Sequence, residues 1–153
     1  MSSPESSGMP KRILGRTGEE VTVLGYGTAE LRGPNWRWSG RGITPEHAGQ
    51  VLNAVLDAGI NLIDTSIDYG ASEELIGRHL AGRRDEYFLA SKCGCLTNPA
   101  DFVPENRGKH VFTRANIITG VDQSLRRLKT DYLDLVQFHG SPSRAALEEH
   151  GAI

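Results

Sequence analysis

Short apolar runs alternate with longer stretches of helical periodicity along most of this chain. Leu62-Ile63 is one such run and stops at Asp64, and the runs over 87–91 and 132–138 stop in the same way at Lys92 and His139. Short apolar runs bounded by polar or turn residues are typical of buried strands. If these runs are neighbouring parallel strands, about 5 Å apart, their carboxyl ends meet at one edge. The pattern therefore predicts Asp64, Lys92 and His139 at one rim of a sheet, with Tyr69 in a loop above it.

The segments between these runs have the signals of helices. A Ser or Thr precedes an amphipathic stretch in each case, as expected for an N-cap. The predicted helices begin at Thr44, Ser72, Thr113 and Ser143, and the first two end at Gly59 and Gly82. Strands that alternate with helices of this length predict βαβ units on a parallel sheet, and polar groups at three consecutive strand ends favour a barrel rim.

The first part of the chain has a different pattern. Residues 1–10 are rich in Ser and Pro and are predicted to be a disordered tail that precedes one domain over 11–153. A turn signal at 16–19 predicts a small hairpin between Lys11 and Leu24. The first strand of the sheet is expected over Val23 to Tyr26, leaving through residues 27–29.

Composition narrows the classes of function. The chain has 153 residues, 24% of them charged, and a formal net charge of −2 without long runs of either sign, so neither nucleic acid nor an anionic membrane surface is an expected partner. No apolar run approaches the ~18 residues that span a bilayer. Residues 31–43 interleave Arg with Trp36 and Trp38, and this segment is either the wall of a pocket or a partly packed surface loop.

The cysteines and the remaining histidines give little indication of a site. Cys93 and Cys95 flank a single glycine, a loop too short for an unstrained disulfide, and two thiolates alone make an incomplete zinc site. We expect reduced thiols in a cytoplasmic protein and no metal site. The histidines outside the rim are expected to be solvated: His47, His79, His110 and His150.

The rim residues suggest proton transfer. A tyrosine beside an ammonium group is a stronger acid than free tyrosine, and a carboxylate keeps that lysine charged and in place. An imidazole can orient a carbonyl oxygen by hydrogen bonding. Each residue alone has an ordinary structural explanation, but Asp64, Tyr69, Lys92 and His139 together predict an acid site in which Tyr69 protonates a carbonyl oxygen.

With these residues at this spacing, the chain resembles the aldo-keto reductase family from about Lys11 to its last residue. The segments that carry the resemblance are Gly-Ile-Asn-Leu-Ile-Asp-Thr-Ser-Ile-Asp-Tyr-Gly over 59–70, Ala-Ser-Lys-Cys-Gly over 90–94 and Asp-Tyr-Leu-Asp-Leu-Val-Gln-Phe-His over 131–139. The resemblance implies a (β/α)8 barrel that reduces an aldehyde or ketone. It also implies that Tyr69 donates the proton, that Lys92 strengthens this acid, that Asp64 pairs with Lys92 and that His139 orients the substrate carbonyl.

The resemblance further implies a cofactor, NADPH or NADH, which supplies the hydride. Gly27, Thr28 and Ala29 match the exit of the first strand that lies near the cofactor in that family, and Asp64 is the fourth residue expected there. The expected partner is a small carbonyl substrate.

The length departs from the family pattern. A complete barrel takes about 250 residues, so these 153 residues are predicted to form the N-terminal half, with a hairpin, four strands, three helices and part of a fourth. Catalysis is then expected only in a longer chain. The alternatives are a non-catalytic binding or regulatory module, as the family also resembles potassium-channel β-subunits, and an inactive fragment. Open sheet edges are expected to favour self-association or a protein partner.

Overall fold

The computed structural model describes residues 8–33, 42–97, 110–149 and 151–153, and the statements below concern these residues. The predictions for the tail over 1–7, for Trp36 and Trp38 and for His150 lie outside this part of the chain. The elements, in chain order, are β1 (Lys11–Ile13), β2 (Glu20–Thr22), β3 (Tyr26–Gly27), α1 (Pro45–Asp57), β4 (Leu62–Asp64), α2 (Ser72–His79), the 3-10 helix η1 (Ala81–Glu86), β5 (Phe88–Cys93), α3 (Arg114–Leu128), β6 (Leu135–Phe138) and α4 (Arg144–Glu149).

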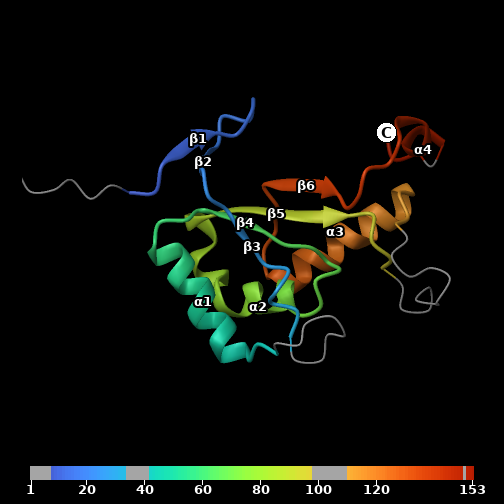
Figure 1. The fold of residues 1–153 in the computed structure, drawn as a ribbon. Coiled ribbons are helices and arrows are strands. Elements are labelled where there is room, and N and C mark those ends of the chain that lie inside the picture. The colour runs from blue at the N-terminus through green and yellow to red at the C-terminus, as the bar shows by residue number, and fades with distance from the viewer. Residues whose placement is uncertain (1–7, 34–41, 98–109, 150) are drawn as a thin grey trace, which may run out of the picture.

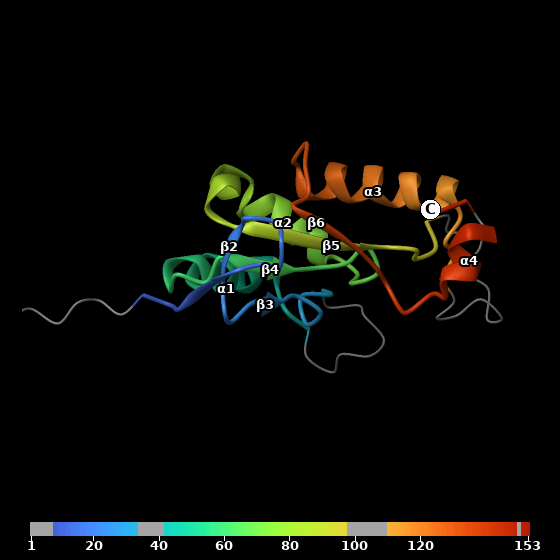
Figure 2. The ribbon, with the colours of Figure 1, turned by 90° about the horizontal axis from the view of Figure 1, so that it is seen from above.

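The central feature is a parallel four-stranded sheet in the order β3-β4-β5-β6, and a separate antiparallel hairpin is made by β1 and β2. Figure 1 shows α1, α2 and α3 along one side of the sheet, with the hairpin near the end where β5 begins and α4 near the end where it finishes. The view from above keeps the hairpin and α4 at opposite ends (Figure 2). The predicted α/β class, hairpin and parallel sheet are confirmed.

One buried cluster joins the helices to the sheet. Ile63 and Leu89, which are neighbours in β4 and β5, are fully buried and face the helices. The cluster consists of Leu31, Ala48, Leu52, Leu56, Ile63, Leu75, Ile76, Leu80, Tyr87, Leu89 and Leu128. Because side chains alternate between the two faces of a strand, burying Ile63 and Leu89 against the helices turns Asp64 and Ala90 to the opposite face.

Helix caps follow the sequence signals at three of the four predicted positions, and at one of the three the Ser143 hydroxyl accepts from the Ala146 amide at 3.2 Å. The side chain of Thr44 accepts a hydrogen bond from the His47 amide at 3.2 Å, and that of Thr113 accepts one from the Asn116 amide at 3.3 Å. The prediction of Ser72 as a cap is wrong, because Ser72 is the first helical residue of α2 and its hydroxyl donates to Thr28 instead. A side chain turned toward the sheet is not available to cap its own helix.

Two strands begin later than predicted. β3 covers only Tyr26–Gly27, because Val23 still belongs to the hairpin region, where its amide donates to the Pro10 carbonyl at 2.8 Å. The chain then bends at Val23 and Leu24 and passes close to β4 at Gly25, where a Cβ would lie 2.9 Å from the Leu62 side chain. β6 likewise starts at Leu135 rather than at 132. In both cases the apolar run begins before the strand pairing does: Val23 and Leu24 are exposed, whereas Leu133 packs against the buried cluster.

The hairpin is fixed to the sheet by one polar residue at the start of β4. The side chain of Asn61 accepts from the Thr22 amide at 2.7 Å and donates to the Glu20 carbonyl at 2.9 Å. The Asn61 amide in turn donates to the Thr22 hydroxyl at 3.2 Å. These three bonds hold β2 across the amino end of the sheet and leave its carboxyl end free for the polar residues of the rim.

Candidate active site

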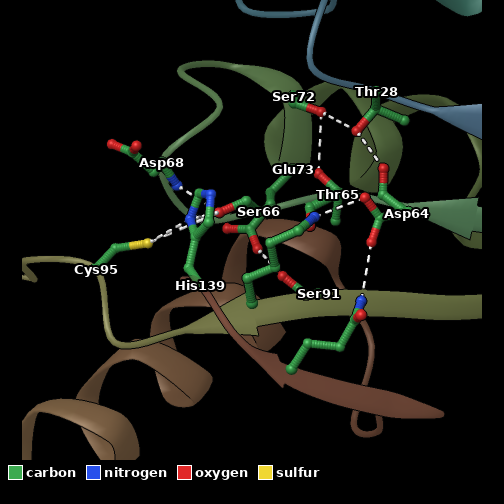
Figure 3. Close-up of polar contacts among 12 residues, drawn as sticks. Thr28, Asp64, Thr65, Ser66, Asp68, Ser72, Glu73, Ser91, Cys95 and His139 are labelled. Carbon is green, nitrogen blue, oxygen red and sulfur yellow. Dashed lines mark hydrogen bonds and ion pairs between the residues drawn. The ribbon is translucent and has the colours of Figure 1, made fainter. Parts of the chain in front are cut away.

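The centre of the site is an ion pair between neighbouring strands. Asp64 pairs in register with Ala90, so Lys92, two residues further along β5, lies on the same face one step beyond it. The Lys92 ammonium donates to Asp64 Oδ2 at 2.6 Å and to the Thr65 carbonyl at 2.8 Å. The other carboxylate oxygen of Asp64 accepts from Gln137 at 3.0 Å. Figure 3 shows the dashed contacts of Asp64 at this rim. The amine is thus held by two fixed acceptors.

Tyr69 follows β4 in the loop that leads to α2, and its ring lies against the ion pair. The Lys92 ammonium is 4.8 Å from the centroid of the Tyr69 ring, and the Arg32 guanidinium carbon is 5.1 Å from it. Two cations therefore approach one tyrosine. The turn depends on Gly70, whose φ is +54°, and a Cβ there would lie 2.5 Å from the Arg32 carbonyl oxygen. The Tyr-Gly pair in the sequence thus has a steric reason.

His139 follows β6 and completes the group. Its backbone amide donates to the Cys93 carbonyl at 2.8 Å, which places the residue beside the end of β5. Its ring meets that of Tyr69 edge-on, with centroids 5.7 Å apart. The structure therefore brings the four residues predicted for the rim, Asp64, Tyr69, Lys92 and His139, to the carboxyl end of β4, β5 and β6.

The surroundings of His139 determine its charge and its tautomer. Burial, and then the nearby His110 and Lys92, lower the pKa of His139 below its ordinary value, so the ring is neutral near pH 7. Its Nδ1 lies 3.2 Å from the Ser66 hydroxyl and 3.0 Å from the Cys95 sulfur (Figure 3). The pKa of the Cys95 thiol is raised to about 11, chiefly by burial, so the thiol keeps its proton.

Both neighbours of Nδ1 are therefore able to donate to it. The Ser66 oxygen already accepts from the Asp68 amide at 3.2 Å, which favours the use of its own hydrogen toward His139. A ring whose Nδ1 accepts carries its proton on Nε2. We assign this tautomer from the hydrogen-bond network, and it places on Nε2 an N–H of the kind that binds a carbonyl oxygen.

The residues expected near a cofactor have different surroundings. Gly27 is exposed, and nothing lies within 4 Å of the position that a Cβ would take. Thr28 is fully buried: its hydroxyl donates to the Asp64 carbonyl at 3.0 Å and accepts from Ser72 at 2.7 Å (Figure 3). Ala29 is half-buried. Of this group, Gly27, Ala29 and Asp64 are at least partly exposed, while the buried Thr28 holds the end of β3 to β4.

Several residues of the site were not predicted from the sequence. Gln137, Ser66 and Cys95 contact Asp64 or His139 directly. Gln137 had a usable signal, because it is a polar residue that interrupts an apolar run two positions before His139. Ser66 and Cys95 had none, since small polar residues after a strand are common in turns.

The prediction of solvated histidines is wrong for two of them. His110 is half-buried, with its ring centroid 5.0 Å from that of His139 and 6.0 Å from that of Phe112. His79 is half-buried as well, and its Nε2 has no hydrogen-bond partner within the described residues. His47 is exposed as expected. The sequence could not show these contacts because they join segments far apart in the chain.

Comparisons with known proteins agree with this geometry. The profile of the Aldo/keto reductase family matches residues 23–150. The aldo-keto reductase YhdN of Bacillus subtilis is 37% identical over 138 residues, which cover 87% of this chain and 38% of that protein. A 6-dehydroglucose reductase of Novosphingobium aromaticivorans is 34% identical over 139 residues, which cover 84% of this chain and 40% of that one. The holo form of an aldo-keto reductase from Bacillus halodurans superimposes with a TM-score of 0.70 at 34% identity, over 88% of this chain and 41% of that structure.

The parallel sheet, the rim residues and these matches together place the chain in the aldo/keto reductase family, a family of oxidoreductases. The chain spans about two fifths of the length of these relatives. Its four-stranded sheet corresponds to part of their barrel, as predicted. Among the described residues, none of the helices is both long and apolar enough to cross a membrane.

Proposed function

We propose that this chain carries the proton-donating half of a carbonyl reductase site that converts an aldehyde or ketone to an alcohol. The observation that supports this most directly is the position of the Lys92 ammonium, 2.6 Å from the Asp64 carboxylate and 4.8 Å from the Tyr69 ring. In the proposed reaction Tyr69 donates the proton, and this fixed positive charge lies beside its ring.

The roles of the residues follow from their contacts. Asp64 and the Thr65 carbonyl accept two hydrogen bonds from the Lys92 ammonium, and these bonds fix the position of the charge. His139, with its proton on Nε2, donates a hydrogen bond to the carbonyl oxygen and orients it toward Tyr69. The Tyr69 hydroxyl then transfers its proton to that oxygen as the carbonyl carbon is reduced.

The hydride is supplied by a reduced nicotinamide cofactor, NADPH or NADH, as in the family. Two residues of this chain fit contacts with such a group. Gly27 leaves the backbone at the end of β3 open, since a Cβ there would meet nothing within 4 Å, and the Asp64 carboxylate lies at the adjacent strand end. Because the chain spans about two fifths of its relatives, activity is proposed for the whole protein that contains these residues.

The test is the replacement Tyr69→Phe in that whole protein. The change removes only the hydroxyl, so the ring contacts with Lys92 and His139 remain. Reduction of an aldehyde substrate, followed by the loss of NADPH absorbance, is expected to slow by about 10²–10⁴-fold, the usual contribution of a general acid. The binding of NADPH, followed by its fluorescence, is expected to change little.

Tyr132→Phe is the matched control. Tyr132 is exposed, and its ring stacks on Arg84 at the opposite end of the sheet, so this variant should keep the rate of the unmodified protein. Near-normal turnover by Tyr69→Phe would contradict the assigned proton donor. Loss of turnover without loss of cofactor binding supports catalysis rather than the alternative of a non-catalytic binding module.

A further inference from the structure

A cluster of metal-ligating side chains shares His139 with the proposed acid site and adds Cys95 and His110 to it. The Cys95 sulfur and ring nitrogens of His110 and His139 all lie within 4.8 Å of one another. Cys95 is buried, whereas the two histidines are half-buried. We propose that these three residues form a binding site for a thiophilic divalent cation of the zinc class.

Backbone contacts bring the three residues together independently of any ion. Cys95 and His110 face each other in an isolated antiparallel bridge, supported by a bond from the Val111 amide to the Gly94 carbonyl at 2.6 Å. The side-chain amide of Asn116 donates to the carbonyls of Cys95 and Val111, both at 2.8 Å. Two segments that are 15 residues apart in the chain (95 to 110) are thus fixed side by side.

The third residue is fixed from the sheet. The bond from the His139 amide to the Cys93 carbonyl holds the end of β6 beside the chain that leads to Cys95. The ring of His110 packs on that of Phe112, at an interplanar angle of 22°, and Phe112 meets Phe138 edge-on at 5.6 Å. Preorganised donors of this kind lose little conformational entropy when an ion binds.

The geometry is close to that of a zinc site. Zinc–sulfur bonds of about 2.3 Å and zinc–nitrogen bonds of about 2.0–2.1 Å place tetrahedral donors roughly 3.3–3.6 Å apart. The observed separation between the Cys95 sulfur and His139 Nδ1 is 3.0 Å, and the largest separation in the group is within 4.8 Å. Small rotations of the side chains would bring the three donors to equal distances from one ion.

The donor set also indicates the kind of ion. One thiolate and two imidazoles favour zinc and similar borderline or soft cations over magnesium or calcium, which prefer oxygen. Three protein donors leave a fourth position for water, as in catalytic rather than structural zinc sites. An ion bound to His139 Nδ1 would replace the contacts of this nitrogen with Ser66 and Cys95 and would leave the proton on Nε2. Binding of the ion itself does not rest on the proposed reductase activity.

The experiment is a titration of the whole metal-free protein with Co²⁺, a spectroscopic substitute for zinc. A near-ultraviolet charge-transfer band is expected from the bond between Co²⁺ and the Cys95 thiolate, and Zn²⁺ should abolish it by displacement. The variants Cys95→Ala and His110→Ala are expected to bind Co²⁺ at least about tenfold more weakly, since loss of even a supporting group costs a metal site this much. Cys95→Ala should also lose the band.

Two matched controls test the specificity of the site. Cys93→Ala removes the neighbouring buried cysteine, and His47→Ala removes an exposed histidine of α1, and both should bind Co²⁺ as the unmodified protein does. Far-ultraviolet circular dichroism establishes that each variant is folded. A band that persists in Cys95→Ala, or Co²⁺ binding that is unchanged in His110→Ala, would overturn the proposal. In that case the cluster would be only a thiol–imidazole hydrogen bond beside a stacked His110.

Discussion

Arg84 in η1 joins the start of β5 to the approach of β6, and its replacement by lysine tests how firmly these two strands are held. Its guanidinium donates to Asp134 Oδ2 at 2.6 Å, to the Tyr87 carbonyl at 2.8 Å and to the Thr130 hydroxyl at 3.3 Å. It also lies 3.9 Å from the centroid of the Tyr132 ring. The side chains of Arg84 and Asp134 are only 10% and 21% exposed, so the ion pair is partly desolvated.

The expected loss follows from the contacts that lysine cannot make. Arg84→Lys keeps the charge and one bond to Asp134, but an ammonium does not reproduce the planar fork that reaches several acceptors at once. A hydrogen bond from a charged donor contributes about 1.5–3 kcal/mol, and a cation–π contact about 0.5–1 kcal/mol. Because lysine recovers part of both, we expect the free energy of unfolding to fall by about 2 kcal/mol.

The assay is urea denaturation of the whole protein, followed by far-ultraviolet circular dichroism, and the control is Arg83→Lys. Arg83 also makes two ion pairs, at 2.9 Å with Asp57 and at 2.7 Å with Glu86, but these partners are 66% and 51% exposed. Exposed pairs contribute little to stability, so the control should unfold almost as the unmodified protein does. Equal losses for the two variants, or no measurable loss for Arg84→Lys, would refute the reasoning from burial.

Two further changes test a buried acid and a strained turn. Burial raises the pKa of Glu73 above its unfolded value, so the folded state keeps a proton that the unfolded chain has lost, and stability should fall as pH rises from the unfolded pKa through the folded one. Glu73→Gln should remove this slope, and parallel curves of unfolding free energy against pH for the two proteins would contradict the assignment. Gly70→Ala should destabilise the protein by more than about 1 kcal/mol, because its φ of +54° is unfavourable for alanine and its Cβ would clash with the Arg32 carbonyl. Gly59→Ala, with φ of +83° and open space around it, should show only the conformational part of that cost, and equal thermal unfolding shifts would argue against the clash.

The sequence predicted most of the fold because its signals are local. The caps at Thr44 and Thr113 and the apolar runs of β4 and β5 depend on residues close to each other in the chain, and the structure contains them as expected. The signal at Ser72 failed, because its hydroxyl joins β3 and β4 through Thr28 and Thr65 instead of capping α2. A local pattern does not distinguish these two uses of the same side chain.

The site was predictable to the extent that it depends on strand ends. Parallel pairing brings the carboxyl ends of neighbouring strands together, so the expectation for Asp64 and Lys92 follows from the end of each apolar run. His110 lies outside this logic. It lies beside His139 through a bridge to Cys95, which is 15 positions earlier in the chain. No spacing rule in the sequence indicates such a contact.

The sequence of β6 indicates a more deeply buried strand than the described structure contains. The run from Tyr132 to Phe138 is nearly continuous in apolar residues, a pattern typical of parallel strands that are covered on both faces. Yet Val136 and Phe138 are 41% and 37% exposed, and β6 is at the edge of the described sheet. On β4 and β5 the residues of the same face are buried against helices, as Ile63 and Leu89 are. The amino-acid pattern of β6 is therefore that of a strand covered on both faces, although the described sheet leaves Val136 and Phe138 exposed.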